Sequence, residues 1–78
     1  MERPNPAQFQ GKKPFGTWLI AQFKRDDAIG QLAKVAFQDP RFPRDGDYKT
    51  VSKYLNGVGA AIEMHEALDE AETDWLAL

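Results

Sequence analysis

The chain has 78 residues, of which 42% are hydrophobic and 28% are charged, and its net charge is -2. A chain of this length forms one domain with a modest core, and this composition argues against overall disorder. Because it has no cysteine, a disulfide scaffold, a thiolate nucleophile and a sulfur-ligated metal are excluded.

Residues 1–14 form a leader rich in proline, glutamine and lysine, which offers few apolar anchors and is expected to be flexible. The leader has no apolar stretch typical of an export signal, and no window of the chain approaches the ~18 consecutive apolar residues of a membrane span. We therefore expect a cytoplasmic protein that makes no use of a membrane. Residues 15–78 are expected to form a single helical domain.

Two helices are predicted in the first half of the chain. Apolar residues at helical spacing between Phe15 and Lys24 predict the first helix. A second apolar stripe, preceded by Asp27 as a plausible N-cap, predicts a helix that ends near Gln38. The apolar residues are Phe15, Trp18, Leu19, Ile20 and Phe23 in the first helix, and Ile29, Leu32, Ala33, Ala36 and Phe37 in the second.

The second half begins with a loop. Residues 39–46 hold two prolines and a glycine, which predicts a turn-rich segment from which Phe42 enters the core. Asp47 could cap a short third helix that stops at Asn56-Gly57. A last helix of four to five turns is predicted by the apolar residues Ala61, Met64, Leu68, Ala71, Trp75 and Leu78. No β-alternation competes, so the fold class is expected to be all-α.

Several strings of this sequence follow the order found in a known family. They are Phe15-Gly16-Thr17-Trp18-Leu19 with Gln22, Arg25-Asp26-Asp27-Ala28-Ile29-Gly30-Gln31-Leu32-Ala33, Asp39 with Phe42-Pro43, Tyr54-Leu55, and Ala71 with Trp75. From Phe15 onward the chain thereby resembles the YozE-like proteins of bacteria and phages, whose domain is similar to the sterile alpha motif. The resemblance implies a compact, sterile-alpha-motif-like bundle of four to five short helices, no established enzymatic activity, and binding of protein or nucleic acid. The glycine-rich stretch 56–59 departs from the family pattern.

The charges are divided along the chain. All ten lysines and arginines lie between Arg3 and Lys53, whereas the stretch from Glu63 to Asp74 holds six acids and no base. Four of these acids repeat at spacings of three and four and form one helix face, namely Glu63, Glu66, Glu70 and Asp74. Such a face commonly serves solubility, and its alternative is a docking surface for a basic partner or for the basic body of a second copy.

Nucleic-acid binding is the alternative function. The Gly57-Val58-Gly59 turn before a helix resembles a helix-hairpin-helix motif, in which backbone N–H groups approach a phosphate. Lys24, Arg25 and Lys53 could supply the cations. The helix that follows carries acids instead of bases, so a plain C-terminal cap is the favoured interpretation of Gly57 and Gly59.

Catalytic and metal chemistry have little support in the sequence. No Ser-His-Asp order, phosphate loop or separated carboxylate pair can be assembled. His65, the only histidine, is expected to border the apolar stripe of the last helix, and Arg25 with Asp27 favours a cap and a local ion pair. Trp18 and Trp75 lie on the apolar stripes and are interpreted as packing residues.

The leading hypothesis is therefore a small non-enzymatic module that binds a protein through charged helix faces. No cofactor, metal or small-molecule substrate is expected, and the protein partner is either unknown or a second copy. A short acidic chain also suits a phage-encoded inhibitor of a host protein, although no motif supports that interpretation.

Overall fold

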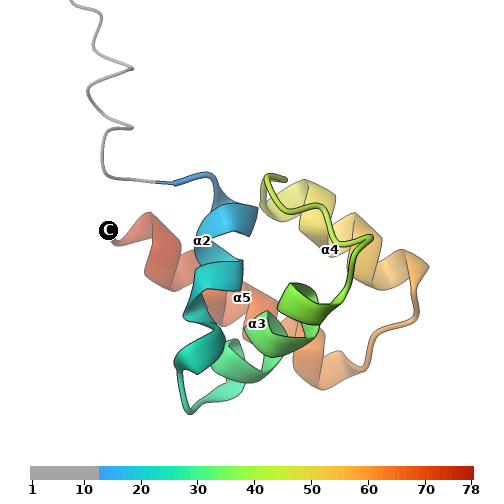
Figure 1. Ribbon diagram of the computed structural model, residues 1–78, viewed down its shortest axis with the longest axis horizontal. Coiled ribbons are helices and arrows are strands. Elements are labelled where there is room, and N and C mark those ends of the chain that lie inside the picture. The colour runs from blue at the N-terminus through green and yellow to red at the C-terminus, as the bar shows by residue number, and fades with distance from the viewer. Residues whose placement is uncertain (1–12) are drawn as a thin grey trace, which may run out of the picture.

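The computed structural model describes residues 13–78, which form four α-helices and one short 3-10 helix (Figure 1). The helices are α2 at Phe15–Ala21, η1 at Gln22–Lys24, α3 at Ala28–Gln38, α4 at Tyr48–Gly57 and α5 at Ile62–Leu76. No strand occurs in residues 13–78, and the all-α bundle of four to five helices is confirmed. Most of the expected leader, residues 1–12, lies outside the described residues. None of the described helices is long and apolar enough to cross a membrane.

Side-chain caps fix the starts of α3 and α4. Asp27 accepts a hydrogen bond from the backbone N–H of Gly30 at 2.9 Å, and Asp47 accepts one from the N–H of Thr50 at 2.8 Å. Each bond satisfies a donor that has no partner within its helix, and each lowers the pKa of the capping carboxyl. Both caps are those that the sequence predicted.

The end of α4 is a Schellman motif built on Gly59. This glycine has a φ of +70°, and its N–H donates to the carbonyl of Asn56 at 3.2 Å while the N–H of Ala60 donates to that of Leu55 at 3.0 Å. Glycine adopts this left-handed conformation without a steric penalty. The helix ends at Gly57, at the predicted Asn56-Gly57 stop, and the left-handed residue of the cap is Gly59.

The core draws on all four α-helices and on the loop between α3 and α4. Its largest fully buried side chains are Phe15, Leu19, Leu32, Val51 and Leu68. Phe42 enters from the loop, as predicted, and only 5% of it is exposed. Burial of this apolar surface is the main force that holds the helices together.

Phe15 is the centre of an aromatic cluster that joins three helices. The ring of Trp75 from α5 meets it edge-on with centroids 5.7 Å apart, and the ring of Tyr48 from α4 lies at 6.1 Å. Trp18 is tilted against it at 6.3 Å. Trp18 and Trp75 pack against the core as predicted, although neither is fully buried. The indole N–H of Trp75 also donates to the carbonyl of Lys13 at 2.8 Å.

The prediction is wrong for three residues at the ends of the apolar stripes, because their side chains are exposed instead of buried. Phe37 is 50% exposed and Leu78 is 65% exposed, and Ala61 also lies at the surface. Phe37 turns outward at the end of α3 and packs edge-on against Phe23, with ring centroids 4.7 Å apart. Ala61 and Leu78 lie just outside the bounds of α5, so its periodicity no longer directs their side chains to the core.

Candidate functional site

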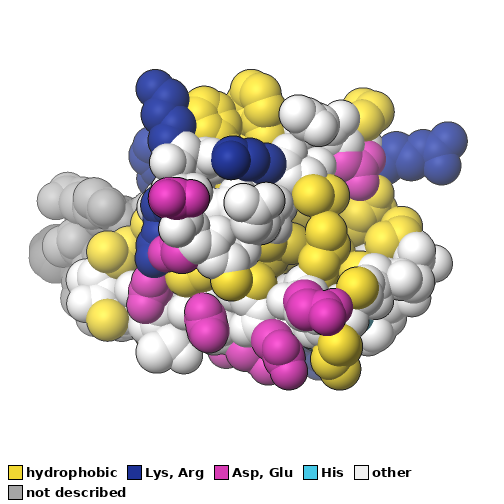
Figure 2. All heavy atoms as spheres, turned by 90° about the horizontal axis from the view of Figure 1, so that it is seen from below, with side chains coloured by type: hydrophobic (Ala, Val, Ile, Leu, Met, Phe, Trp, Pro, Cys, Tyr) yellow, Lys and Arg dark blue, Asp and Glu magenta, His cyan; other side chains and the backbone are white. Residues whose placement is uncertain are grey.

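The four acids predicted to form one helix face lie on α5, the longest of the described helices. This helix packs against α2, α3 and α4 and runs behind α2 and α3 in Figure 1, with Ala67, Leu68 and Ala71 buried on its inner side. Its outer side carries three exposed glutamates, Glu63, Glu66 and Glu70. In Figure 2 most visible acidic side chains gather in the lower half of the view, whereas most Lys and Arg side chains lie in the upper half.

These three glutamates have no partner in the described part of the chain. The ion pairs and side-chain hydrogen bonds among residues 13–78 do not include any of them, and their own helix supplies no base. We use the name acidic face for Glu63, Glu66 and Glu70 from here on. Its negative charges are therefore available to a partner molecule.

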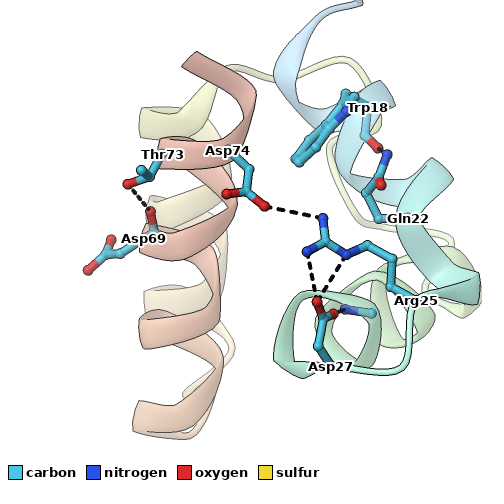
Figure 3. Close-up of polar contacts among 8 residues, drawn as sticks. Trp18, Gln22, Arg25, Asp27, Asp69, Thr73 and Asp74 are labelled. Atoms are coloured by element: carbon cyan, nitrogen blue, oxygen red, sulfur yellow. Dashed lines mark hydrogen bonds and ion pairs between the residues drawn. The ribbon is translucent and has the colours of Figure 1, made fainter. Parts of the chain in front are cut away.

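Asp74, the fourth acid of the predicted face, is already bound within the fold (Figure 3). Its carboxylate meets Arg25 Nη1 at 3.3 Å, while Nη2 of the same guanidinium meets Asp27 at 2.7 Å. The bond to Asp27 is the main cause of the raised pKa of Arg25. Arg25 thus joins the N-cap of α3 to the last turns of α5, which confirms the local ion pair predicted for Arg25 and Asp27.

Asp69 is likewise bound within the fold. It accepts a hydrogen bond from the hydroxyl of Tyr48 at 2.5 Å, which fastens α4 to α5 and is the first cause of the raised pKa of Tyr48. The sequence analysis assigned no role to this pair. Because 21 positions separate the two residues, no local spacing signal could have revealed it.

The residues of the alternative nucleic-acid site are not brought together. Lys24 ends η1, which packs against α2 and α3 and makes no close backbone contact with α4, where Lys53 lies. Figure 1 shows η1 at the lower left and α4 at the upper right. Arg25 forms ion pairs with the carboxylates of Asp27 and Asp74. The N–H groups of Gly59 and Ala60 are bonded to the carbonyls of α4, as the capping interpretation expects.

Lys53 has a different cationic neighbour. Together with Arg41, Pro43, Thr50 and Tyr54 it lines a shallow hollow of about 400 Å³ beside α4. The hydroxyl of Tyr54 donates to the carboxylate of Asp39, and this bond is the first cause of the lowered pKa of Asp39 and of the raised pKa of Tyr54. An acid therefore adjoins the cations of this hollow, which weakens its attraction for a phosphate.

No metal centre can be built from the described residues. No three His, Asp or Glu side chains in residues 13–78 are grouped closely enough to hold an ion. His65 is half-buried on α5, at the border of the apolar stripe where it was expected.

Comparison with known proteins identifies relatives along most of the chain. A family model described as the YozE SAM-like fold matches residues 15–77. The chain is 35% identical over 69 residues to a UPF0346 protein of Streptococcus thermophilus. The alignment covers 85% of this chain and 97% of that relative. It is 38% identical over 47 residues to a UPF0346 protein of Streptococcus uberis, and this alignment covers 56% of this chain and 66% of that relative. No solved structure gives a significant match.

Proposed function

This chain belongs to the YozE SAM-like family, and we propose that it is a small non-enzymatic interaction module that binds a positively charged protein through the acidic face of α5. The observation that carries the proposal is the contrast among the acids of that helix. Asp69 and Asp74 are bound within the fold, whereas Glu63, Glu66 and Glu70 are exposed and have no partner in residues 13–78.

Two glutamates of the acidic face, Glu66 and Glu70, weaken the helix that carries them. Glu66 and Glu70 are four residues apart, so they are neighbours on the helix surface and repel each other by about 0.2 to 0.5 kcal/mol. A face that served to stabilise the helix would mix glutamate with lysine at this spacing, yet the stretch from Glu63 to Asp74 holds no lysine or arginine. A basic partner would relieve this repulsion, which supports a docking role.

Such a surface acts mainly through electrostatic steering. Like charges on one face attract a basic protein over a distance of about 8 to 10 Å at ordinary salt, and they set its orientation on arrival. Binding is therefore expected to be fast and to weaken as the salt concentration rises.

The proposal can be tested with two variants of equal net charge. Immobilised wild-type chain, the double variant E66Q/E70Q and the double variant D26N/D45N are incubated with a lysate of the source cells at low and high salt. Asp26 and Asp45 are exposed acids outside α5, so the second variant controls for charge alone. A protein retained at low salt by the wild type and by D26N/D45N, but lost by E66Q/E70Q, supports the proposal. Equal retention by all three would contradict it.

Weak nucleic-acid binding has less support. Of its proposed residues, Arg25 is bound to two carboxylates, and Lys24 and Lys53 lie on elements that make no close backbone contact. A titration of labelled protein with duplex and single-stranded DNA at two salt concentrations separates this function from the first. Binding that falls steeply with salt and is lost on reversal of Lys24 and Arg25 to glutamate would favour it.

A further inference from the structure

A groove runs between the beginnings of α3 and α5. Its volume is about 310 Å³, and nearly all of its surface is apolar. The lining comes from Ala28, Gln31 and Leu32 of α3, from Ala61 just before α5, and from Met64 and Ala67 of α5, with Glu63 as its charged residue. Figure 2, which views the molecule from below, shows apolar side chains in the middle of the face and acidic side chains beside them.

Three of the seven residues that line the groove are alanines. The side chains of Ala28, Ala61 and Ala67 are too short to fill the space between α3 and α5. Met64 is the largest flexible residue of the lining, and methionine adapts its shape to different apolar partners. Ile62, next to the groove in sequence, is 68% exposed, which extends the apolar surface at this end.

Glu63 belongs both to the groove and to the acidic face. From Glu63 to Glu70 the helix advances about 10 Å at 1.5 Å per residue, which is about two turns. One segment of a partner can therefore occupy the groove and meet all three glutamates. The chemistry that fits this surface is one large apolar side chain with lysines or arginines beside it.

We propose that the groove receives an apolar anchor residue of a basic amphipathic helix from a partner protein, whose lysines and arginines contact the acidic face. This inference rests on the proposed function and names its partner. A helical segment fits because the described residues present no strand edge to which an extended peptide could pair, and because helix-in-groove recognition uses anchors at such spacings. A small molecule fits poorly, since the groove offers almost no polar groups to orient it.

Two peptides and three groove variants test the inference. The first peptide is a helical 14-mer with lysines on one face and leucines on the other, and the second has alanine in place of each leucine. Ala28→Phe and Ala61→Phe each fill the groove from an exposed position, and Ala21→Phe is the control at an exposed position that does not line it. Circular dichroism checks that each variant folds, and fluorescence anisotropy of the labelled peptide gives Kd.

The wild type and Ala21→Phe are expected to bind the leucine peptide at least about tenfold more tightly than the alanine peptide, since burying one leucine is worth that much. Ala28→Phe and Ala61→Phe are expected to bind the two peptides equally. If the wild type binds both peptides equally and E66Q/E70Q binds neither, the groove inference is overturned while the acidic face stands. If the wild type binds neither peptide, the groove inference is also overturned, and the lysate comparison decides the proposed function on its own.

Discussion

The α-carbon of Gly30 lies against the backbone carbonyl of Arg25, so that a β-carbon on Gly30 would stand 1.9 Å from that oxygen. The contact lets the chain between η1 and α3 fold tightly, with Asp27 bonded to the N–H of Gly30 and to the guanidinium of Arg25. Any side chain at Gly30 would therefore have to push the backbone of this turn away from α3.

We predict that Gly30→Ala lowers the free energy of unfolding by about 2 kcal/mol or more, because the clash is with backbone that cannot swing aside. Gly57→Ala is the matched control, since a β-carbon there meets nothing within 4 Å and alanine favours the helix by up to about 1 kcal/mol. Urea unfolding of both variants measures the difference. A Gly30→Ala protein as stable as the wild type would refute the close contact.

We also predict that two similar substitutions on α5 act in opposite directions. Asp74→Asn removes the ion pair with Arg25 and should cost about 0.5 kcal/mol of stability, since both side chains are partly exposed. Glu66→Gln removes the repulsion from Glu70 and should add about 0.3 kcal/mol. Thermal unfolding at low salt measures both effects, and both should shrink in 1 M salt. Destabilisation by Glu66→Gln would show that Glu66 has a structural partner.

A third prediction concerns the two kinds of leucine on α5. Leu68 is 1% exposed, so Leu68→Ala should lower the free energy of unfolding by about 3 kcal/mol. Leu76 is 59% exposed, so Leu76→Ala should change it by less than about 0.5 kcal/mol. Chemical denaturation gives both values. A large cost at Leu76 would mean that the end of α5 is covered in solution, for example by a second copy.

The dependence of stability on pH follows from the bonded carboxyls. The pKa values of Asp27, Asp39 and Asp47 are all lowered in the folded chain by the hydrogen bonds they accept. Their contribution is therefore fully present above the ordinary aspartate pKa of about 4 and is lost as the pH falls through the folded values. The urea midpoint should accordingly decrease between about pH 4 and pH 2.

Tyr54 makes the stability depend on pH in the alkaline range. The pKa of Tyr54 is raised, first by its bond to Asp39, so the stability it contributes is present below about pH 10 and is lost as the pH rises through the folded value. Tyr54→Phe should raise the pKa of Asp39 toward its ordinary value, because the hydroxyl is the main cause of its lowering. An NMR titration of the Asp39 carboxyl tests this, and an unchanged pKa would assign the effect to other neighbours.

Much of the fold could be predicted from the sequence because its signals are local. The caps Asp27 and Asp47 bond to N–H groups three residues ahead, and the apolar stripes repeat within single helices, so both can be read without knowing how the helices pack. Periodicity failed at Phe37, Ala61 and Leu78 because they lie at or beyond helix ends, where it no longer fixes the direction of a side chain.

The sequence by itself determined the four described α-helices, the caps of α3 and α4 and the division of charge along the chain. Only the tertiary structure decided which charges remain available to a partner. Arg25 bonds to Asp74 across 49 positions, which removes Asp74 from the predicted acidic helix face and Arg25 from the predicted nucleic-acid site. The need for glycine at position 30 and the groove between α3 and α5 were decided in the same way. These features depend on distances between helices, which arise from the packing of the whole core and leave no fixed spacing in the sequence.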